Sequence, residues 1–393
     1  MLNSKFETKF AGIPTPFYYY DLDLLQETLQ SAIEYSKKHG YFLHYALKAN
    51  ADDRVLQIIK EAGIGADCVS GNEVSKALKT GFLAEDIFYA GVGKTDKEII
   101  LGLEGKIACF NCESLQEITV INEIAGKMGL KAKIALRINP NIESHTHSYI
   151  TTGMQENKFG IQLWEMGEVL SVASELENIS MEGLHFHIGS QITDLDVFAN
   201  LCHKVNEING WFINAGFQAR MLNLGGGLGI DYSSPDKFPI PDFENYFGII
   251  NSLLKPHSGQ DVHFELGRSL VAQMGSLITR VLYTKMGKSK NFVVTDAGMT
   301  ELIRPALYNS FHKIENLSKN ESEAAMLNGD IKKYDVVGPV CETSDFFAKG
   351  IDLPVTERGD ILAIRSAGAY AQSMSLEYNL RDKAGVIYSD DLV

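Results

Sequence analysis

Residues 41–81 read YFLHYALK at 41–48, VLQIIKEAG at 55–63, GADCVS at 65–70 and NEVSKALKTG at 72–81. The first and third runs are short and mostly apolar, whereas the second and fourth have apolar residues at helical spacing. A buried strand followed by a helix, twice in succession, is typical of parallel strands that helices cover on both faces. This stretch therefore predicts an α/β fold.

The same alternation continues through six further strand-like runs. They are IFYAG at 87–91, KIACFN at 106–111, KAKIALRINP at 131–140, GLHFHIGSQ at 183–191, MLNLGGG at 221–227 and VHFELGR at 262–268. A long loop at 141–159 separates the fifth strand from the sixth. Eight strands that alternate with helices have the count and order of a (β/α)8 barrel, which we expect over residues 25–268.

After residue 268 the rhythm changes, because strand-like runs follow one another with few long helices between them. Examples are SLITRVLYTKMG at 276–287, NFVVTDAGM at 291–299 and GDILAIRSAGAYA at 359–371. A chain of 393 residues is also long for one core. We predict a second, mostly β domain from residues 269–393 together with 1–24. The segment PFYYYDLD at 16–23 is expected to pair with it, since chain termini often lie together.

Composition restricts the partners and the compartment. The formal net charge of -14 disfavours nucleic acid and anionic membranes as partners. Residues 1–10 hold no apolar signal segment, and no run approaches the length of a membrane span. The five cysteines are odd in number and scattered, which suits free thiols in the cytoplasm. Of these, Cys109 and Cys112 form a lone CxxC, for which burial in a strand is the favoured interpretation.

Charged residues stand at the ends of two predicted strands, where a barrel places its catalytic groups. Lys48 closes the first strand, and partial desolvation there would lower its pKa and suit Schiff-base chemistry. The plainer alternative is a lysine whose stem lies on apolar surface while its amine reaches water. Glu265 and Arg268 close the eighth strand. Glu265 suits a carboxylate that keeps a pyridine nitrogen protonated, and a buried Glu265–Arg268 ion pair is the alternative.

Glycines follow the seventh strand as GGGLG at 225–229. Such a loop lets backbone N–H groups approach an anion, and this position in a barrel is a frequent phosphate site, although a tight turn without a ligand is the alternative. The spacing does not match a dinucleotide fingerprint. The segment FYAGVGKT at 88–95 resembles a P-loop, but Phe88 stands where its first glycine belongs, so we reject a nucleotide site there.

Two HxH pairs, His145/His147 in the long loop and His185/His187 on the sixth strand, favour a second hypothesis. Metal-dependent barrel hydrolases use such pairs, so a divalent-metal hydrolase is the main alternative. The absence of an acidic residue placed as a further ligand argues against it. A packed, structural histidine is the alternative role for His185, and we expect no metal.

Beyond the barrel, Cys341 and Glu342 lie in GPVCETSDF at 338–346, where a cysteine beside an acid suggests a loop that carries a proton donor. An incidental loop thiol is the alternative. Together with YALKAN at 45–50, HFHIGSQ at 185–191, GGGLG, ELGRS at 265–269, DAGMTELIRPALY at 296–308 and GAYAQSM at 368–374, this motif closely resembles the diaminopimelate decarboxylases. These enzymes have the alanine-racemase-like fold and use pyridoxal 5'-phosphate. The resemblance covers residues 17–388, and Thr343 replaces an expected serine.

The resemblance implies a role for each matching residue. Lys48 would bind the cofactor covalently, His187 would stack on its ring, and Glu265 would meet its pyridine nitrogen. The phosphate would be surrounded by Ser190, Gly226, Gly227, Gly267 and Arg268. The distal carboxylate of meso-diaminopimelate would be bound by Arg268, Arg304 and Tyr308, and its distal ammonium by Glu342. Cys341 would protonate the substrate carbon, Tyr370 would contact cofactor and substrate, and Cys341 and Glu342 would come from the partner chain of a homodimer.

The substrate's chemistry agrees with these roles. Meso-diaminopimelate carries an amine and a carboxylate at each end, so its distal end needs both a cation and an acid, which Arg304 and Glu342 supply. A lysine or ornithine decarboxylase would face only a distal ammonium, which a buried arginine would repel. Three hypotheses follow: the decarboxylase, the metal-dependent hydrolase, and a pyridoxal-phosphate carrier without catalytic activity.

Overall fold

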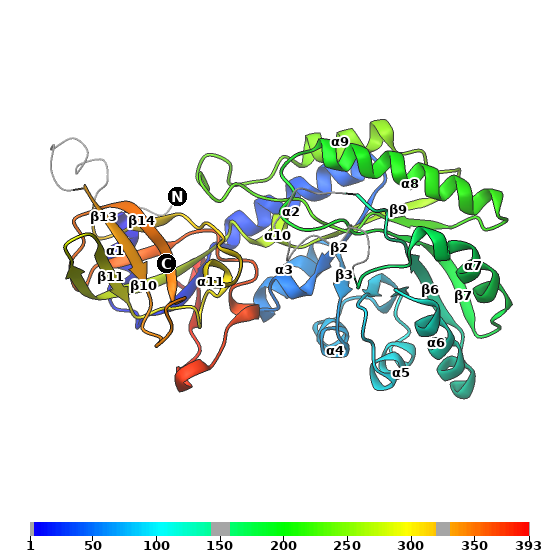
Figure 1. The fold of residues 1–393 in the computed structure, drawn as a ribbon, viewed down its shortest axis with the longest axis horizontal. Coiled ribbons are helices and arrows are strands. Elements are labelled where there is room, and N and C mark those ends of the chain that lie inside the picture. Colours follow the sequence, from blue (N-terminus) through cyan, green and yellow to red (C-terminus); the bar gives the residue numbers. More distant parts are fainter. Residues whose placement is uncertain (1–3, 143–157, 320–330, 393) are drawn as a thin grey trace. The chain divides into compact units, whose positions relative to one another are not determined.

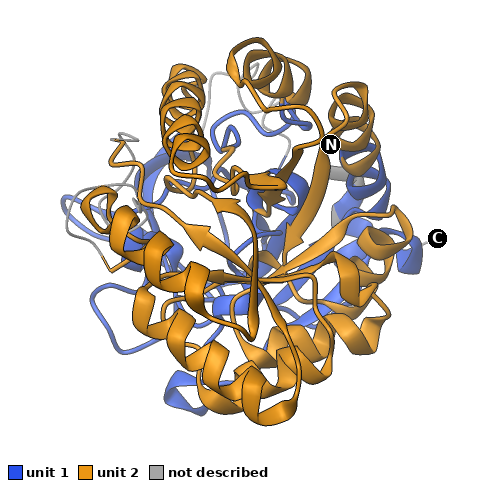
Figure 2. Ribbon diagram, turned by 90° about the vertical axis from the view of Figure 1, so that its right-hand side faces the viewer, with its two compact units in different colours: residues 1–28, 230–241, 268–393 blue, residues 29–229, 242–267 orange. Residues whose placement is uncertain are grey.

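The computed structural model describes residues 4–142, 158–319 and 331–392. The chain forms two compact units (Figure 2). The barrel unit comprises Leu29–Gly229 and Asp242–Gly267, and the β unit comprises Met1–Thr28, Ile230–Pro241 and Arg268–Val393. The segment Ile230–Pro241 lies inside the range expected for the barrel and groups with the β unit.

The barrel unit contains a closed barrel of eight parallel strands in chain order, with helices around it (Figure 2). The strands are β2 (Phe42–Ala46), β3 (Gly65–Cys68), β4 (Ile87–Tyr89), β5 (Cys109–Cys112), β6 (Ala132–Arg137), β7 (Ile179–His185), β8 (Met221–Asn223) and β9 (Asp261–Leu266). Pairing of β2 with β9 closes the ring. The predicted (β/α)8 barrel is therefore confirmed.

Helices connect these strands, and α8 and α9 lie side by side along one flank (Figure 1). The helices from α2 onward are α2 (Leu22–Lys38), α3 (Asp53–Glu61), α4 (Gly71–Thr80), α5 (Asp96–Glu104), α6 (Leu115–Met128), α7 (Met166–Glu175), α8 (Asp196–Asn214) and α9 (Phe243–Leu253). Short 3-10 turns are η1 (Leu47–Ala49), η2 (Ala84–Asp86) and η3 (Leu163–Glu165).

Local capping explains where several helices begin after their strands. Ser70 precedes α4, and its side chain accepts the backbone N–H of Glu73. Ser114 precedes α6, and its side chain accepts the backbone N–H of Glu117. Thr95 forms a capping box with Glu98 at the start of α5. These side chains satisfy backbone donors of the first helical turn, which ends each strand-to-helix loop at a defined residue.

The strands of the barrel are covered on both faces. Every residue of β3, β4 and β5 is buried, including both cysteines of the CxxC in β5. Burial raises the pKa of the Cys109 and Cys112 thiols. The prediction that this pair is packed in a strand is confirmed.

The β unit is built on one eight-stranded sheet in which β12, β15, β10, β11, β13 and β14 are neighbours in that order. Its strands are β1 (Phe17–Tyr20), β10 (Gly275–Met286), β11 (Asn291–Thr295), β12 (Ile314–Asn316), β13 (Ile331–Val337), β14 (Phe346–Pro354), β15 (Ile361–Ile364) and β16 (Gly385–Tyr388). Its helical segments are α1 (Ser4–Phe10), α10 (Arg268–Val271), α11 (Arg304–Tyr308), η4 (Gln372–Met374), η5 (Tyr378–Leu380) and η6 (Ser389–Leu392).

Strand β1 joins the two ends of the chain. It pairs antiparallel with β10 and parallel with β16, so the expected pairing of the N-terminal segment with the β domain is confirmed. Phe17 and Tyr19 on β1 pack into a core with Phe10 and Ile278. Among the described residues, no helix combines the length and apolarity that a membrane-spanning segment needs.

Candidate active site

Lys48 lies in the turn η1, immediately beyond β2. The sequence predicted Lys48 to be the last residue of the first strand, but β2 ends at Ala46. Its Nζ is 3.4 Å from Oδ2 of Asp67, and the Lys48 side chain is 37% exposed whereas that of Asp67 is fully buried. Ala46 and Asp67 are partners in the register of β2 and β3, which brings the two side chains together. The Lys48 amine therefore lies close to a buried carboxylate while it remains accessible to solvent.

Asp67 is a site residue that sequence reasoning missed. Its Oδ1 is buried and has no hydrogen-bond partner among the described residues. Burial, followed by repulsion from Glu265, raises the pKa of Asp67, and the charge of Lys48 acts in the opposite direction. Buried titratable groups with specific charged neighbours are typical of functional sites. The signal in the sequence was an aspartate inside the apolar run GADCVS.

Glu265 on β9 lies at the centre of a buried hydrogen-bond network. Its Oε1 accepts the side-chain amides of Asn111 at 3.0 Å and Asn223 at 2.7 Å. Its Oε2 lies 3.0 Å from Nε2 of His185. Burial acts to raise the pKa of Glu265, but the charge and hydrogen bond of His185, together with the charges of Lys48 and His187, outweigh it and the pKa is lowered. Glu265 is therefore held as a carboxylate.

This network leaves room for one more donor. A carboxylate offers about four lone-pair positions, and the three hydrogen bonds to Glu265 use three of them. The protonated nitrogen of a pyridine ring is a donor of the kind that the fourth position accepts. Three partners of Glu265 come from β5, β7 and β8, so no local sequence pattern could reveal them.

His187 follows β7 rather than lying on it. The sequence predicted that His185 and His187 both lie on the sixth strand, but β7 ends at His185, so this prediction is wrong for His187. Its Nδ1 accepts the backbone N–H of Gly226 at 3.2 Å. Burial, followed by the charges of Arg137 and Lys48, lowers the pKa of His187. A neutral imidazole that is held in this way suits stacking on a ring.

The glycine loop after β8 passes against other backbone. A Cβ on Gly226 would lie 2.1 Å from the carbonyl oxygen of Glu265, and Gly227 has a φ of +115°, which L side chains rarely adopt. Leu228 forms a parallel bridge with Ile192, so this loop runs beside the one that contains Ser190. The N–H of Gly226 is already donated to His187, so this glycine serves close packing as well. With Lys48, His187 and Glu265, these loops fit a ring that carries an aldehyde and a phosphate.

A second cluster lies within the β unit around Arg304, the first residue of α11. Its Nη1 donates to Oη of Tyr232 at 2.9 Å and to Nε2 of His312 at 2.9 Å. The Arg268 Nη1 also donates to Tyr232, at 2.6 Å. Both arginines are buried, at 4% and 5% exposure. Burial, partly offset by Tyr232 and then reinforced by Arg268, lowers the pKa of Arg304.

Two predicted tyrosines belong to the same part of the chain. The Tyr370 ring lies under the guanidinium of Arg268, with its centroid 4.8 Å from Cζ. Tyr308 is the last residue of α11 and is half-buried. Sequence reasoning thus found Arg268, Arg304 and Tyr370, which the structure brings together, and missed Tyr232 and His312.

The Cys341–Glu342 loop of the β unit is exposed. The Cys341 Sγ is 3.5 Å from Nδ2 of Asn379, and Oε1 of Glu342 accepts the hydroxyl of Tyr378 at 2.8 Å. The prediction that these two residues lie in a loop is confirmed. Their contacts with η5 hold both side chains at the surface.

The rejected nucleotide site is occupied by structural contacts. The Lys94 side chain is buried, and its Nζ lies 2.6 Å from Glu117 and donates to the carbonyl oxygens of Gly91 and Asn111. A lysine neutralised in this way has no donor left for a phosphate.

The metal hypothesis also lacks a ligand set in the described part of the chain. No group of three or more His, Cys, Asp or Glu side chains there could hold a metal ion. His185 instead contacts Glu265. The other pair, His145 and His147, lies outside the described residues.

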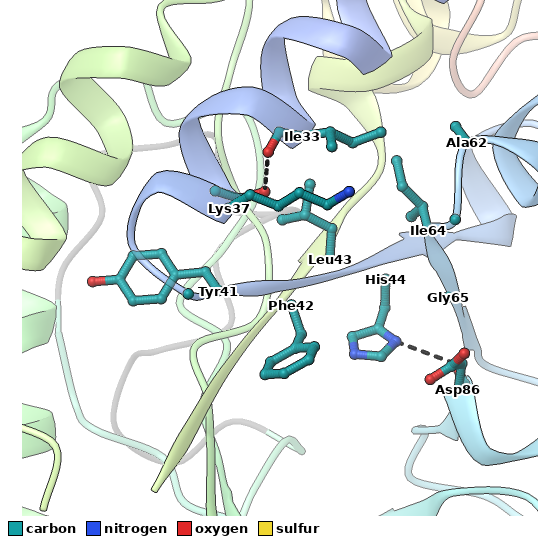
Figure 3. A pocket seen from close by; sticks show the side chains of 13 residues that line it. Ile33, Lys37, Tyr41, Phe42, Leu43, His44, Ala62, Ile64, Gly65 and Asp86 are labelled. Atoms are coloured by element: carbon teal, nitrogen blue, oxygen red, sulfur yellow. Dashed lines mark hydrogen bonds between the residues drawn. The ribbon is translucent and has the colours of Figure 1, made fainter. Parts of the chain in front are cut away.

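A pocket of about 240 Å³ opens beside the amino ends of β2 and β3 (Figure 3). Ile33, Leu43 and Ile64 give it an apolar wall, and Nδ1 of His44 lies 3.2 Å from the carbonyl oxygen of Asp86. The described residues that line it include none of the predicted site residues. Since Lys48 follows the carboxyl end of β2, the pocket lies at the opposite end of the strands from the chemistry.

Comparison with known proteins places these observations in a family. Residues 25–272 match the family described as "Pyridoxal-dependent decarboxylase, pyridoxal binding domain". The diaminopimelate decarboxylase of Bacteroides thetaiotaomicron is 51% identical over 387 residues, which are 98% of each chain. That of Aquifex aeolicus is 41% identical over 95% of this chain and 86% of the relative. The crystal structure of Helicobacter pylori diaminopimelate decarboxylase complexed with L-lysine has a TM-score of 0.90 at 39% identity, covering 98% and 94% of the two chains.

Proposed function

The chain belongs to the diaminopimelate decarboxylases, and on that basis we propose a role for each of its site residues. It is a pyridoxal-phosphate-dependent carboxy-lyase of lysine biosynthesis that converts meso-diaminopimelate to L-lysine and CO2. The bound cofactor supplies an electron sink for the electron pair that remains when the carboxyl group leaves as CO2.

The barrel cluster would hold the cofactor. Lys48 Nζ is the amine that would bind the cofactor's aldehyde carbon, because it follows a barrel strand and remains partly exposed beside Asp67. Glu265 would accept the pyridine N–H at its remaining lone-pair position, and neutral His187 would stack on the ring. The phosphate would be surrounded by Ser190, Gly226, Gly227, Gly267 and Arg268.

The observation that carries the substrate assignment is the state of Arg304. Among the described residues, no carboxylate pairs with its buried guanidinium, and its Nη1 partners are a phenol and an imidazole. A buried cation ordinarily has an anionic partner, because desolvation of an unpaired charge is costly. A carboxylate at the far end of the substrate would supply that partner. Arg268, Tyr308 and Tyr370 would complete the binding site.

Cys341 and Glu342 would act on opposite ends of the substrate. The Cys341 thiol would deliver a proton to the carbon that has lost its carboxyl group. Glu342 would accept hydrogen bonds from the distal ammonium. Both side chains are exposed and each is held by η5, which supports a role in contact with another surface.

We also propose a homodimer in which each chain lends this loop to the partner's site. Large apolar side chains stand exposed on the segment that contacts the loop: Leu376 at 39%, Tyr378 at 45% and Leu380 at 96% exposure. Exposed apolar groups of this kind commonly mark protein interfaces. In a two-fold dimer the same surface is used reciprocally, so both sites would be completed in the same way.

A cytoplasmic location is part of the proposal. All five cysteines are free, and four of them are buried. Free thiols persist in reducing compartments, which supports this location.

One experiment tests the reaction and the anchor together. The purified protein, loaded with pyridoxal phosphate, is incubated with meso-diaminopimelate, and the expected products are L-lysine and CO2. Borohydride reduction followed by peptide mass spectrometry should then find the cofactor on Lys48. Cofactor attached to another lysine would contradict the assignment of Lys48, and absence of lysine formation would contradict the function.

A further inference from the structure

Arg304 has two partners in the β unit, a phenol and an imidazole, which accept both hydrogens of one of its nitrogens. Nη1 carries two hydrogens, and these are donated to Oη of Tyr232 and Nε2 of His312, each at 2.9 Å. In the described part of the chain, Nη2 and Nε of Arg304 donate to no protein acceptor. The guanidinium is thus fixed by one edge while its other N–H groups and its charge remain available.

The tautomer of His312 is fixed by its second contact. Its Nδ1 lies 2.9 Å from the carbonyl oxygen of Arg365, which can only accept, so Nδ1 carries the proton. Nε2 then carries the lone pair that accepts from Arg304. Burial, followed by the charge of Arg304, lowers the pKa of His312 to about 3. His312 therefore stays a neutral acceptor across the physiological pH range.

The acidic residues nearby are occupied by a different arginine. Arg365 pairs with Asp236 at 2.8 Å and with Glu315 at 2.6 Å. The backbone N–H of Arg365 also donates to the carbonyl oxygen of Lys313, at the edge where β12 and β15 pair. The backbone that supports His312 is therefore rigid. The carboxylates of Asp236 and Glu315 are paired with Arg365.

Tyr232 completes the arrangement. Its hydroxyl oxygen accepts from both Arg268 and Arg304, and its ring packs edge-on against His312 with centroids 4.9 Å apart. A single phenol oxygen therefore accepts from two guanidinium groups and holds them near each other.

We propose that Tyr232 and His312 are positioning residues that set specificity for a distal carboxylate, because they orient Arg304 without neutralising it. An acidic residue in either place would orient Arg304 equally well but would also satisfy its charge, and the substrate's carboxylate would then bind weakly. The inference rests on the proposed role of Arg304 and adds the reason that its charge remains available.

The test uses two ligands that differ only in that carboxylate. Decarboxylation removes the carboxyl group at the reacting end, so L-lysine keeps the distal carboxylate and 1,5-diaminopentane lacks it. Inhibition constants of both are measured on the holoenzyme, together with kcat and KM for meso-diaminopimelate. The wild type should prefer L-lysine, and the ratio of the two inhibition constants reports carboxylate recognition separately from general damage to the site.

We expect His312→Glu to reduce that preference by roughly thirtyfold or more, the scale of losing one charge-assisted pair. The KM for meso-diaminopimelate should rise with it, while kcat changes much less. His312→Gln keeps a neutral acceptor and should restore most of the preference. Tyr232→Phe, which loses only the hydroxyl, should have an intermediate effect.

Stability separates positioning from misfolding. His312→Glu gives the buried Arg304 a counter-ion, so it should melt no lower than His312→Leu although it binds the carboxylate more weakly. His257→Glu is the matched control: His257 Nε2 lies 2.8 Å from the carbonyl oxygen of Ala219 in the barrel unit, and the same charge there should leave the ratio unchanged.

The outcomes distinguish this inference from the proposed function. If the wild-type enzyme forms no lysine, both the proposed function and this inference are wrong. If the wild type is active but Arg304→Leu keeps the preference for L-lysine, the role of Arg304 is wrong. If Arg304→Leu loses the preference while His312→Glu keeps it, the positioning role alone is overturned.

Discussion

Replacement of Glu265 by glutamine exchanges one oxygen for an NH2 group and removes the negative charge from the buried network of the barrel. The glutamine oxygen can still accept the two asparagine amides that Oε1 accepts in the wild type. The new NH2 group would face Nε2 of His185, so His185 must present a lone pair there and move its proton to Nδ1. Nδ1 is buried and has no partner among the described residues, so the moved proton would be unsatisfied.

The cost in stability follows from this exchange. All three hydrogen bonds become neutral instead of charge-assisted, and the moved N–H of His185 is buried without a partner, which together predict a loss of about 1–3 kcal/mol in the free energy of unfolding. The loss should depend on pH. The folded state lowers the pKa of Glu265, whereas the unfolded value is about 4.3, so its contribution is full above that value. It disappears as pH falls from about 4 toward the folded pKa, and the difference between wild type and variant should shrink there.

The cost in activity should be larger. Without a carboxylate to hold the pyridine nitrogen protonated, the electron sink weakens, and we expect kcat to fall by about 10²–10³, the scale for losing one preorganised electrostatic partner. Cofactor content, measured by absorbance, should stay near stoichiometric because Lys48 is untouched. The assay is lysine formation under saturating substrate.

Glu98→Gln is the matched control. Glu98 accepts the backbone N–H groups of Gly71 and Thr95, and the first of these is the main cause that lowers its pKa to about 2. It should lose comparable stability without loss of kcat. A Glu265→Gln enzyme with kcat within about threefold of the wild type would refute the reasoning, as would a stability difference that does not change between neutral and acidic pH.

Three further predictions concern the proposed roles. Arg304→Leu should lower kcat/KM for meso-diaminopimelate by a factor that corresponds to about 2–5 kcal/mol, and an unchanged value in steady-state kinetics would make Arg304 structural. Cys341→Ala should retain cofactor and substrate binding but form lysine slowly, and a wild-type rate would remove the thiol from the mechanism. Mixing Lys48→Ala with Cys341→Ala should restore about a quarter of wild-type activity if sites are shared, since about half of the dimers are mixed and each has one intact site; no recovery after verified subunit exchange would exclude the shared site.

The sequence predicted the barrel well because its signals are local. Each strand is a short buried run, and capping residues such as Ser70 and Ser114 follow it directly. Strand ends were less predictable. β2 ends before Lys48 and β7 ends before His187, because hydrophobic patterns continue beyond the last residue that pairs with a neighbour. A buried loop residue has the same pattern as a buried strand residue.

Apart from Asp67, the residues that sequence reasoning missed are neutral. Lys48, Glu265 and Arg304 attract attention because a charge in apolar surroundings is unusual. Asn111, Asn223 and His312 are ordinary neutral residues in the sequence, and only their contacts show what they do.

These neutral partners determine which charged side chains remain available to bind a ligand. The two asparagines donate hydrogen bonds to Glu265 without bringing a positive charge, so its remaining lone-pair position can still accept a proton-bearing ring nitrogen. His312 orients Arg304 without supplying a negative charge, so the guanidinium can still bind a carboxylate. In both cases a charged partner of opposite sign would stabilise the side chain more strongly and would make it unavailable to a ligand. The identity of the charged residues therefore indicates the chemistry, and the neutrality of their neighbours determines whether a ligand can take part in it.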